Sequence, residues 1–293
     1  MTTLSLGFSP CPNDTFIFHA LVHGLVRVPG VEFRPVLEDV ETLNHLARAG
    51  QLDLTKVSFG VLPHILEEYS LLRSGGALGR GCGPLLVARE PIPSVSLRDS
   101  VIAIPGHYTT ANLLLRLFAP EAVERVEMPY DRIMPAVATG EVDAGLIIHE
   151  SRFTYPDHGL MKVVDLGEWW EQTTGSPIPL GAIVARRSLG ELAGAVARGI
   201  RASVERAFAD PTASAGYVRE HAQELSEEVT RSHIDLYVNR FSVDLGAEGE
   251  AAVRELLARA DAARLIPPRT VDPFEVSATR SALRRTGPPS PER

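Results

Sequence analysis

Short apolar runs alternate with helical patterns along the first half of the chain, and this order constrains the fold more than any other feature. Such an alternation is typical of an α/β fold whose sheets are largely parallel. The apolar runs predict strands at residues 4–8, 31–37, 52–58, 101–104, 123–128 and 142–148. The segments between them predict helices at residues 15–23, 40–49, 110–118 and 132–138.

The alternation is repeated within the chain. Gly50-Gln51-Leu52-Asp53 and Gly140-Glu141-Val142-Asp143 each connect a predicted helix to an apolar strand. The turns that follow the first strand of each copy also correspond, at residues 8–15 and 105–110. We therefore expect two α/β lobes of related topology.

Two apolar segments, Pro84–Arg89 and Leu180–Arg186, are expected to carry the chain between these lobes. Two crossings divide the chain into a larger discontinuous lobe, residues 1–88 and 184–284, and a smaller lobe, residues 89–183. A protein of this design holds a ligand in the cleft between its lobes and closes by bending at the crossings. A single continuous sheet without a hinge is the alternative.

The chain becomes helical after Pro179. Apolar residues at a spacing of four predict a helix over 192–208, and further helical patterns cover 214–228, 230–241 and 248–265. The last residues, 285–293, are rich in proline and charge, and we expect this tail to be disordered.

The charge balance bears on the class of partner. The chain has 29 basic and 37 acidic residues and a net charge of −8, the wrong sign for unspecific binding to nucleic acid or to anionic lipid. Cys11 and Cys82 are too few and too far apart for a disulfide scaffold or a structural zinc site. No basic segment with an apolar run opens the chain, and no run approaches about 18 apolar residues. We expect a cytoplasmic protein.

Polar residues follow the ends of several predicted strands, which is where ligands bind in open α/β sheets. These places are residues 9–15, 56–58, 107–110 and 149–151. His149 ends the apolar run of the last strand, and an imidazole with an ordinary pKa of about 6.5 is the natural general base at neutral pH. A histidine taken at random is more often a surface or core residue, so the position at a strand end is what selects His149.

Lys56 and Ser58 face one side of their predicted strand, and Val57 faces the other. A lysine in an apolar strand is costly to bury unless it meets an anion. That anion is either a ligand or a structural carboxylate such as Asp53 or Asp143, and the sequence favours neither.

Thr109 and Thr110 open a predicted helix, where backbone N–H groups can bind a carboxylate. A capping role for Thr109 is the stronger interpretation of this pair. Cys11 lies between Pro10 and Pro12, and we assign it to rigid packing of that turn rather than to thiolate chemistry.

The run Ser9-Pro10-Cys11-Pro12-Asn13-Asp14-Thr15-Phe16, together with Lys56-Val57-Ser58, Thr109-Thr110 and Ile148-His149-Glu150, resembles the 1,4-dihydroxy-6-naphthoate synthase family of the futalosine route to menaquinone. The resemblance extends from about Leu4 to Leu265. It implies a type II periplasmic-binding-protein-like fold with an interlobe cleft. It also implies a lyase, without export, that acts on cyclic dehypoxanthine futalosine.

The resemblance also implies roles for particular residues. His149 corresponds to the proton acceptor. The segments that contact the substrate correspond to Lys56, Val57, Ser58, Thr109 and Thr110, and further candidates for substrate contact are Ser9, Asn13, Asp14 and Thr15. No metal and no cofactor is expected, and the expected partner is a small carboxylate, with a homodimer as the candidate assembly.

Two other functions fit the same fold. One is a non-exported protein that only binds small carboxylates, because fold does not determine function. The other is the related chorismate dehydratase of the same pathway. Substrate assays with identification of the product would separate the three.

Overall fold

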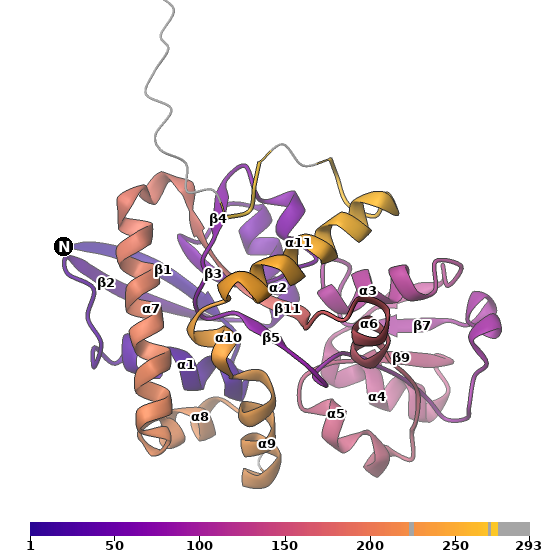
Figure 1. Ribbon diagram of the computed structural model, residues 1–293. Helices are drawn as coiled ribbons and strands as arrows, with labels where there is room; N and C mark the ends of the chain where they lie inside the picture. Colours follow the sequence, from indigo (N-terminus) through magenta and orange to yellow (C-terminus); the bar gives the residue numbers. More distant parts are fainter. Residues whose placement is uncertain (223–225, 269–270, 275–293) are drawn as a thin grey trace, which may run out of the picture.

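The computed structural model describes residues 1–222, 226–268 and 271–274, and its strands form two mixed sheets. Figure 1 shows the two sheets in separate halves of the molecule. The first sheet has the order β2-β1-β3-β11-β4, with β5 also paired to β11. Its strands are β1 (Thr2–Phe8), β2 (Val31–Leu37), β3 (Leu54–Ser58), β4 (Tyr69–Leu71), β5 (Ala77–Gly79) and β11 (Ile178–Arg186).

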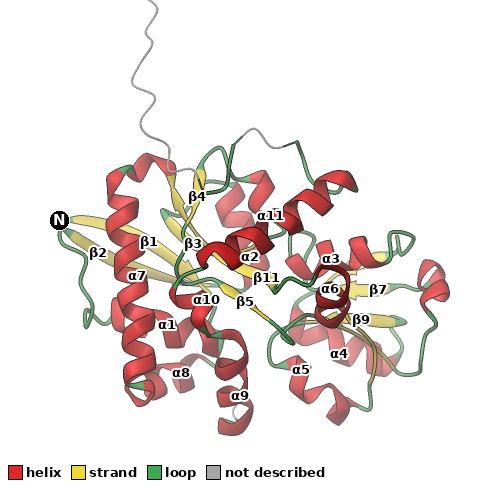
Figure 2. Cartoon of the chain, viewed as in Figure 1, coloured by secondary structure: helices red, strands yellow, loops and turns green. Residues whose placement is uncertain are grey.

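The second sheet has the order β10-β6-β9-β7-β8. Its strands are β6 (Leu85–Ala88), β7 (Ile102–Ile104), β8 (Arg125–Glu127), β9 (Ala144–Ile147) and β10 (Met161–Asp165). Figure 2 shows helices packed around both sheets. The helices are α1 (Pro12–Val22), α2 (Val40–Arg48), α3 (Thr110–Phe118), α4 (Tyr130–Thr139), α5 (Ser151–Thr154), α6 (Leu166–Thr174), α7 (Glu191–Ala209), α8 (Ala215–His221), α9 (Glu227–Tyr237), α10 (Arg240–Val243) and α11 (Gly246–Ala262).

The α/β architecture with two sheets is confirmed, but the sheets are mixed rather than mostly parallel. Strand β1 runs parallel to β2 and β3, and β7 runs parallel to β8 and β9. Strand β11 is antiparallel to β3, β4 and β5, and β6 is antiparallel to β9 and β10. The antiparallel pairs arise at β6 and β11, the two segments that we expected to carry the chain between lobes.

These two strands lie entirely within single sheets. Strand β6 belongs to the second sheet and β11 to the first, so the chain passes between the sheets just before β6 and again between α6 and β11. Both passages fall slightly earlier in the chain than the boundaries at residues 88 and 183. The division into lobes at those two residues stays a prediction.

The internal repeat is visible in the backbone and in the hydrogen bonds. Gly50 and Gly140 both adopt left-handed backbone angles, with φ of +62° and +82°, which a residue without Cβ adopts at little cost. The carboxylate of Asp53 accepts hydrogen bonds from the backbone N–H and the hydroxyl of Ser5, at 2.8 and 2.7 Å. The carboxylate of Asp143 accepts from the backbone N–H of Val101 at 2.8 Å. The carboxylate therefore ties the helix-to-strand turn to β1 in the first copy and to the residue directly before β7 in the second copy.

The C-terminal helices differ from two predictions. The helix expected over 214–228 ends at His221 as α8, and residues 223–225 lie outside the described residues. The helix expected over 230–241 begins earlier and is broken after Tyr237, because Asn239 caps a new helix by accepting from the backbone N–H of Phe241 at 2.9 Å. The tail at 285–293 lies outside the described residues.

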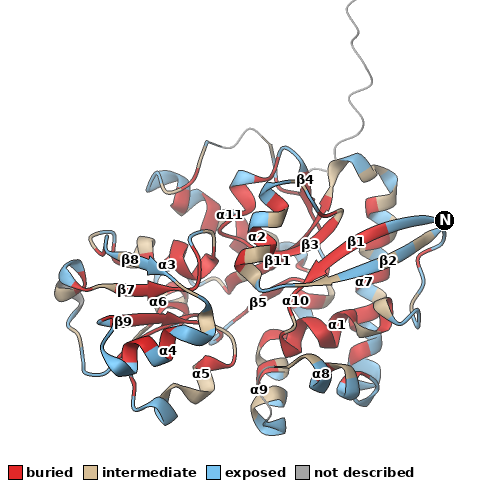
Figure 3. Ribbon diagram, turned by 180° about the vertical axis from the view of Figure 1, so that it is seen from behind, coloured by how far each residue is buried: buried red, intermediate tan, exposed pale blue. Residues whose placement is uncertain are grey.

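The centre of both sheets is buried, as the red strands of Figure 3 show. Every residue of β3, β6 and β9 is buried. Polar residues at the ends of these buried strands are therefore held against a rigid, close-packed core.

No helix among the described residues is long and apolar enough to cross a bilayer.

The first passage between the sheets depends on one close backbone contact. A Cβ at Gly83 would lie 2.3 Å from the Cα of Gly167. We expect Gly83→Ala to destabilise the protein by about 1–3 kcal/mol, as overpacking against rigid backbone does. Gly216 in α8 has open space around it, so Gly216→Ala is the matched control and should be neutral or stabilising. Urea unfolding measures both, and equal stabilities would contradict the prediction.

Candidate active site

A cavity of about 90 Å³ lies between the two sheets, where strand ends from both meet the first turns of α1 and α3. Most of the residues that the sequence selected line it. These residues are Ser9, Asn13, Asp14, Lys56, Ser58, Thr109, Thr110 and His149. The structure therefore brings together polar groups from both lobes of the predicted fold.

Val57 and Thr15 are not among the lining residues. Val57 is fully buried in the hydrophobic core, on the face of β3 opposite Lys56 and Ser58. The hydroxyl of Thr15 donates to the backbone carbonyl of Cys11 at 3.1 Å. Substrate contact with Val57 or Thr15 stays a prediction, and it would have to use backbone atoms because both side chains are packed inside the protein.

Asp14 is the most strongly hydrogen-bonded group of the cavity. Its Oδ1 accepts from Lys56 Nζ and from the side-chain amide of Asn13, both at 2.9 Å. Its Oδ2 accepts from the backbone N–H and the hydroxyl of Ser9, at 3.1 and 2.8 Å. Because α1 begins at Pro12, these bonds tie the first turn of the helix to the end of β3.

The partner of Lys56 is therefore a protein carboxylate that the sequence did not identify. Asp14 takes the place that we expected for Asp53 or Asp143 or for a ligand anion, and Lys56 also donates to the carbonyl of Gly75 at 3.2 Å. Both members of the pair are buried. Pairing with Asp14 offsets the cost of burying an ammonium group.

Ser58 keeps a hydrogen-bond donor for a ligand. Its backbone N–H donates to Asn44 Oδ1 at 2.9 Å, and its hydroxyl oxygen accepts from Asn44 Nδ2 at 3.2 Å. Within the described part of the chain, the hydroxyl proton has no acceptor. A hydroxyl fixed in this way, on the wall of the cavity, can donate to an anionic ligand.

The two threonine hydroxyls are already used within the protein. Thr109 accepts from the backbone N–H of Asn112 at 3.1 Å, which confirms its capping role on α3. The hydroxyl of Thr110 donates to the carbonyl of Leu180 at 2.7 Å and accepts from the N–H of Gly60 at 3.2 Å. What this helix start can offer to an anion is its backbone N–H groups.

His149 has an unusual backbone conformation, with φ of +57° in the left-handed region. Such a conformation costs energy for a residue with Cβ and is often found at functional sites. The rings of His149 and Tyr130 are steeply inclined to each other, with 5.3 Å between centroids, and the ring of His149 lies nearly parallel to that of His233, with 6.1 Å between centroids. Burial lowers the pKa of His149, and the nearby carboxylates of Glu150 and Asp14 oppose this effect. The imidazole is therefore neutral at pH 7 and able to accept a proton.

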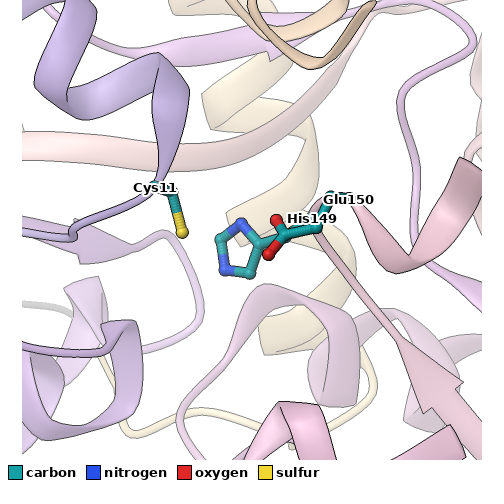
Figure 4. A group of neighbouring side chains, drawn as sticks. All are labelled: Cys11, His149 and Glu150. Atoms are coloured by element: carbon teal, nitrogen blue, oxygen red, sulfur yellow. The ribbon is translucent and has the colours of Figure 1, made fainter. Parts of the chain in front are cut away.

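Cys11, His149 and Glu150 converge on one point, as Figure 4 shows. Each offers one donor atom, and these atoms lie within 4.8 Å of one another. Burial is the main cause that raises the pKa of the Cys11 thiol, and Glu150 adds to it. Cys11 is therefore uncharged as the thiol, next to the ring of His149 and the side chain of Glu150.

Sequence reasoning missed several residues of this site. Glu150 is buried beside His149, and the sequence identifies it only as the next residue in the chain. His233 is fully buried and comes from α9, and Tyr237 of the same helix lines the cavity. Nothing in the sequence around these two residues distinguishes them from the core face of an ordinary helix.

The fold and the site together define the class of protein. The alkanesulfonate-binding protein of Xanthomonas axonopodis pv. citri superposes with a TM-score of 0.69 at 18% identity, covering 92% of this chain and 96% of that chain. A structure from Archaeoglobus fulgidus superposes with a TM-score of 0.85 at 38% identity, covering 90% and 98%. The periplasmic-binding-protein-like fold is thus confirmed.

Residues 4–262 match the model of a family described as menaquinone biosynthesis, and the chain belongs to this family. Two curated relatives are each named 1,4-dihydroxy-6-naphtoate synthase. The relative from Thermus thermophilus is 58% identical over 92% of this chain and 97% of its own length. The relative from Streptomyces coelicolor is 54% identical over 90% and 95%. The family resemblance seen in the sequence is confirmed.

The buried ion pair predicts a stability effect. Lys56→Met should lower the free energy of unfolding by about 3–5 kcal/mol, because it leaves the carboxylate of Asp14 buried without its cation. Lys56→Met combined with Asp14→Asn should cost less than the sum of the two single changes. Urea unfolding of the four proteins measures the coupling, and additive effects would show that the pair contributes little.

The burial of Cys11 predicts tolerance to substitution. Cys11→Ser should keep most of the catalytic activity, because the buried thiol is protonated and serves packing. The measurement is turnover of the purified variant, with its melting temperature as the control for folding. Loss of turnover in a folded Cys11→Ser protein would overturn the assignment.

Proposed function

We propose that this protein converts cyclic dehypoxanthine futalosine to 1,4-dihydroxy-6-naphthoate, with His149 as the proton acceptor. The observation that carries the proposal is a neutral imidazole held in a strained backbone conformation on the wall of the interlobe cavity. The substrate is the one that the family resemblance implies, and the product agrees with the names of both curated relatives.

The proposed chemistry uses groups already in place. His149 removes a proton bonded to carbon, and the electron pair left on the substrate enters an enolate. A carbon–carbon bond then breaks, and the fragment that departs from the naphthoate takes the electron pair of that bond and the proton held by His149, which restores the neutral base. Aromatisation of the naphthoate supplies much of the driving force. The hydroxyl of Ser58 and the backbone N–H groups at the start of α3 are suited to the substrate carboxylate and to the developing enolate oxygen. Lys56 acts through Asp14, whose position it holds.

The proposal also covers the partner, the cofactor requirement, the assembly and the location of the protein. The partner is a small carboxylate, and the scheme requires neither a metal nor a redox cofactor. A cytoplasmic location belongs to the proposal on the grounds given by the sequence, and a homodimer belongs to it as the candidate assembly. Either of two experimental results would replace the proposed function: binding of small carboxylates without turnover, or dehydration of a chorismate-derived substrate.

The direct test is an assay of naphthoate formation with His149→Asn. Asparagine is similar in size and still hydrogen-bonds, but it cannot accept the proton. We expect kcat to fall by roughly 10²–10⁴-fold with little change in substrate binding. Near-wild-type turnover in a folded variant would exclude His149 as the base, and His107 at the corresponding strand end would be examined next.

The pH dependence provides a second test. A base must be unprotonated, so activity falls when the pH drops through its pKa. Because burial lowers the pKa of His149, the acid limb of kcat/KM should lie below the ordinary imidazole value of about 6.5. The rate profile measures this midpoint. An acid limb above the ordinary imidazole value would contradict the assignment.

A further inference from the structure

Two buried atoms next to His149 have no hydrogen-bond partner among the described residues. They are Oε2 of Glu150 and Nδ1 of His233. These two atoms face each other at 3.7 Å, and both side chains are buried. Leaving a buried polar atom without a partner is costly, so these two atoms require a functional explanation.

The hydrogen bonds around His233 determine which of its nitrogens carries the proton. The side-chain amide of Asn13 donates to Asp14, so its Oδ1 is the atom that meets His233 Nε2 at 2.9 Å. That oxygen can only accept, and Nε2 therefore donates. Burial lowers the pKa of His233 well below its ordinary value, and a positive charge on the neighbouring His149 would lower it further. The ring is neutral, and the lone pair on Nδ1 points toward Glu150.

The charges near His149 single out Glu150. Asp14 is balanced by Lys56 at 2.9 Å. Asp39 uses its carboxylate to cap α2 by accepting from the backbone N–H groups of Glu41 and Thr42. Glu150 pairs with no lysine or arginine in the described residues. Its Oε1 accepts from the Tyr130 hydroxyl at 3.5 Å, its Oε2 lies 3.7 Å from the neutral ring of His233, and the carboxylate also lies within 4.8 Å of ligand atoms of His149 and Cys11. Cys11 is uncharged as the thiol.

We propose that Glu150 and His233 are positioning residues for the base. The carboxylate of Glu150 supplies the negative charge that balances the imidazolium of His149 once the proton has been taken. His233, anchored to Asn13 and parallel to the ring of His149, keeps that ring in place. The inference rests on the proposed role of His149 and deepens it.

The proposal predicts a particular change in the rate profile. Glu150→Gln keeps the shape of the side chain and removes its charge. We expect kcat to fall by about tenfold or more, yet by less than the 10²–10⁴-fold expected for His149→Asn, with KM within about threefold of wild type. Without the negative charge the imidazolium is less stable, so the acid limb should move to lower pH.

Two further variants complete the set. Glu150→Asp keeps the negative charge, but its side chain is one methylene group shorter and places that charge farther from His149. The acid limb of this variant should therefore lie between those of wild type and Glu150→Gln. It also provides the same test if Glu150→Gln does not fold. His233→Gln can still donate to Asn13 but loses the parallel ring, and we expect kcat to fall without a matching change in KM.

The controls are Glu141→Gln and His158→Gln, two exposed positions in the same half of the molecule. Both should have wild-type kinetics. A folded Glu150→Gln protein with an unmoved acid limb would overturn the inference, whether or not kcat falls, because a purely structural role does not shift the limb. An active His149→Asn enzyme would instead overturn the proposed function, so the two failures are distinguishable.

Discussion

The buried ion pair between Asp14 and Lys56 is the interaction on which the site depends. It connects the first turn of α1 to the end of β3, and the hydrogen bonds from Ser9 and Asn13 hold the same carboxylate in one position. Charges buried this deeply are tolerated only when each is paired and hydrogen-bonded. The pair therefore fixes the wall of the cavity on the side of the first sheet, and through Asn13 it also fixes His233.

Direct contacts join the two sheets across the cavity. The hydroxyl of Thr110 bridges the N–H of Gly60 and the carbonyl of Leu180, and Glu41 accepts from the backbone N–H of Tyr108 at 2.9 Å. A Cβ at Gly60 would lie 2.6 Å from the carbonyl oxygen of Thr109, so only glycine allows this approach. These contacts hold the two halves close enough for groups from both to meet one substrate, which is the geometric condition for orienting it.

Burial determines the protonation state of the groups that line this cavity. It lowers the pKa values of His149 and His233 and raises that of Cys11, so all three are uncharged at neutral pH. A neutral imidazole can act as a base, whereas a protonated thiol is a poor nucleophile. Glu150 remains as the group that can balance a new positive charge on His149. The low polarity that makes the base neutral thus also creates the need for a nearby carboxylate.

The sequence by itself determined most of the strands and helices, the internal repeat and the position of His149 at a strand end. These features depend on local patterns of apolar residues and turn residues, and each such pattern is contained within a short segment of the chain. The tertiary structure decided that Lys56 pairs with Asp14, that β6 and β11 run antiparallel to their neighbours, and that His233 of α9 reaches Glu150. Contacts between such distant segments depend on how whole helices and strands pack around the core, and no local pattern records that packing.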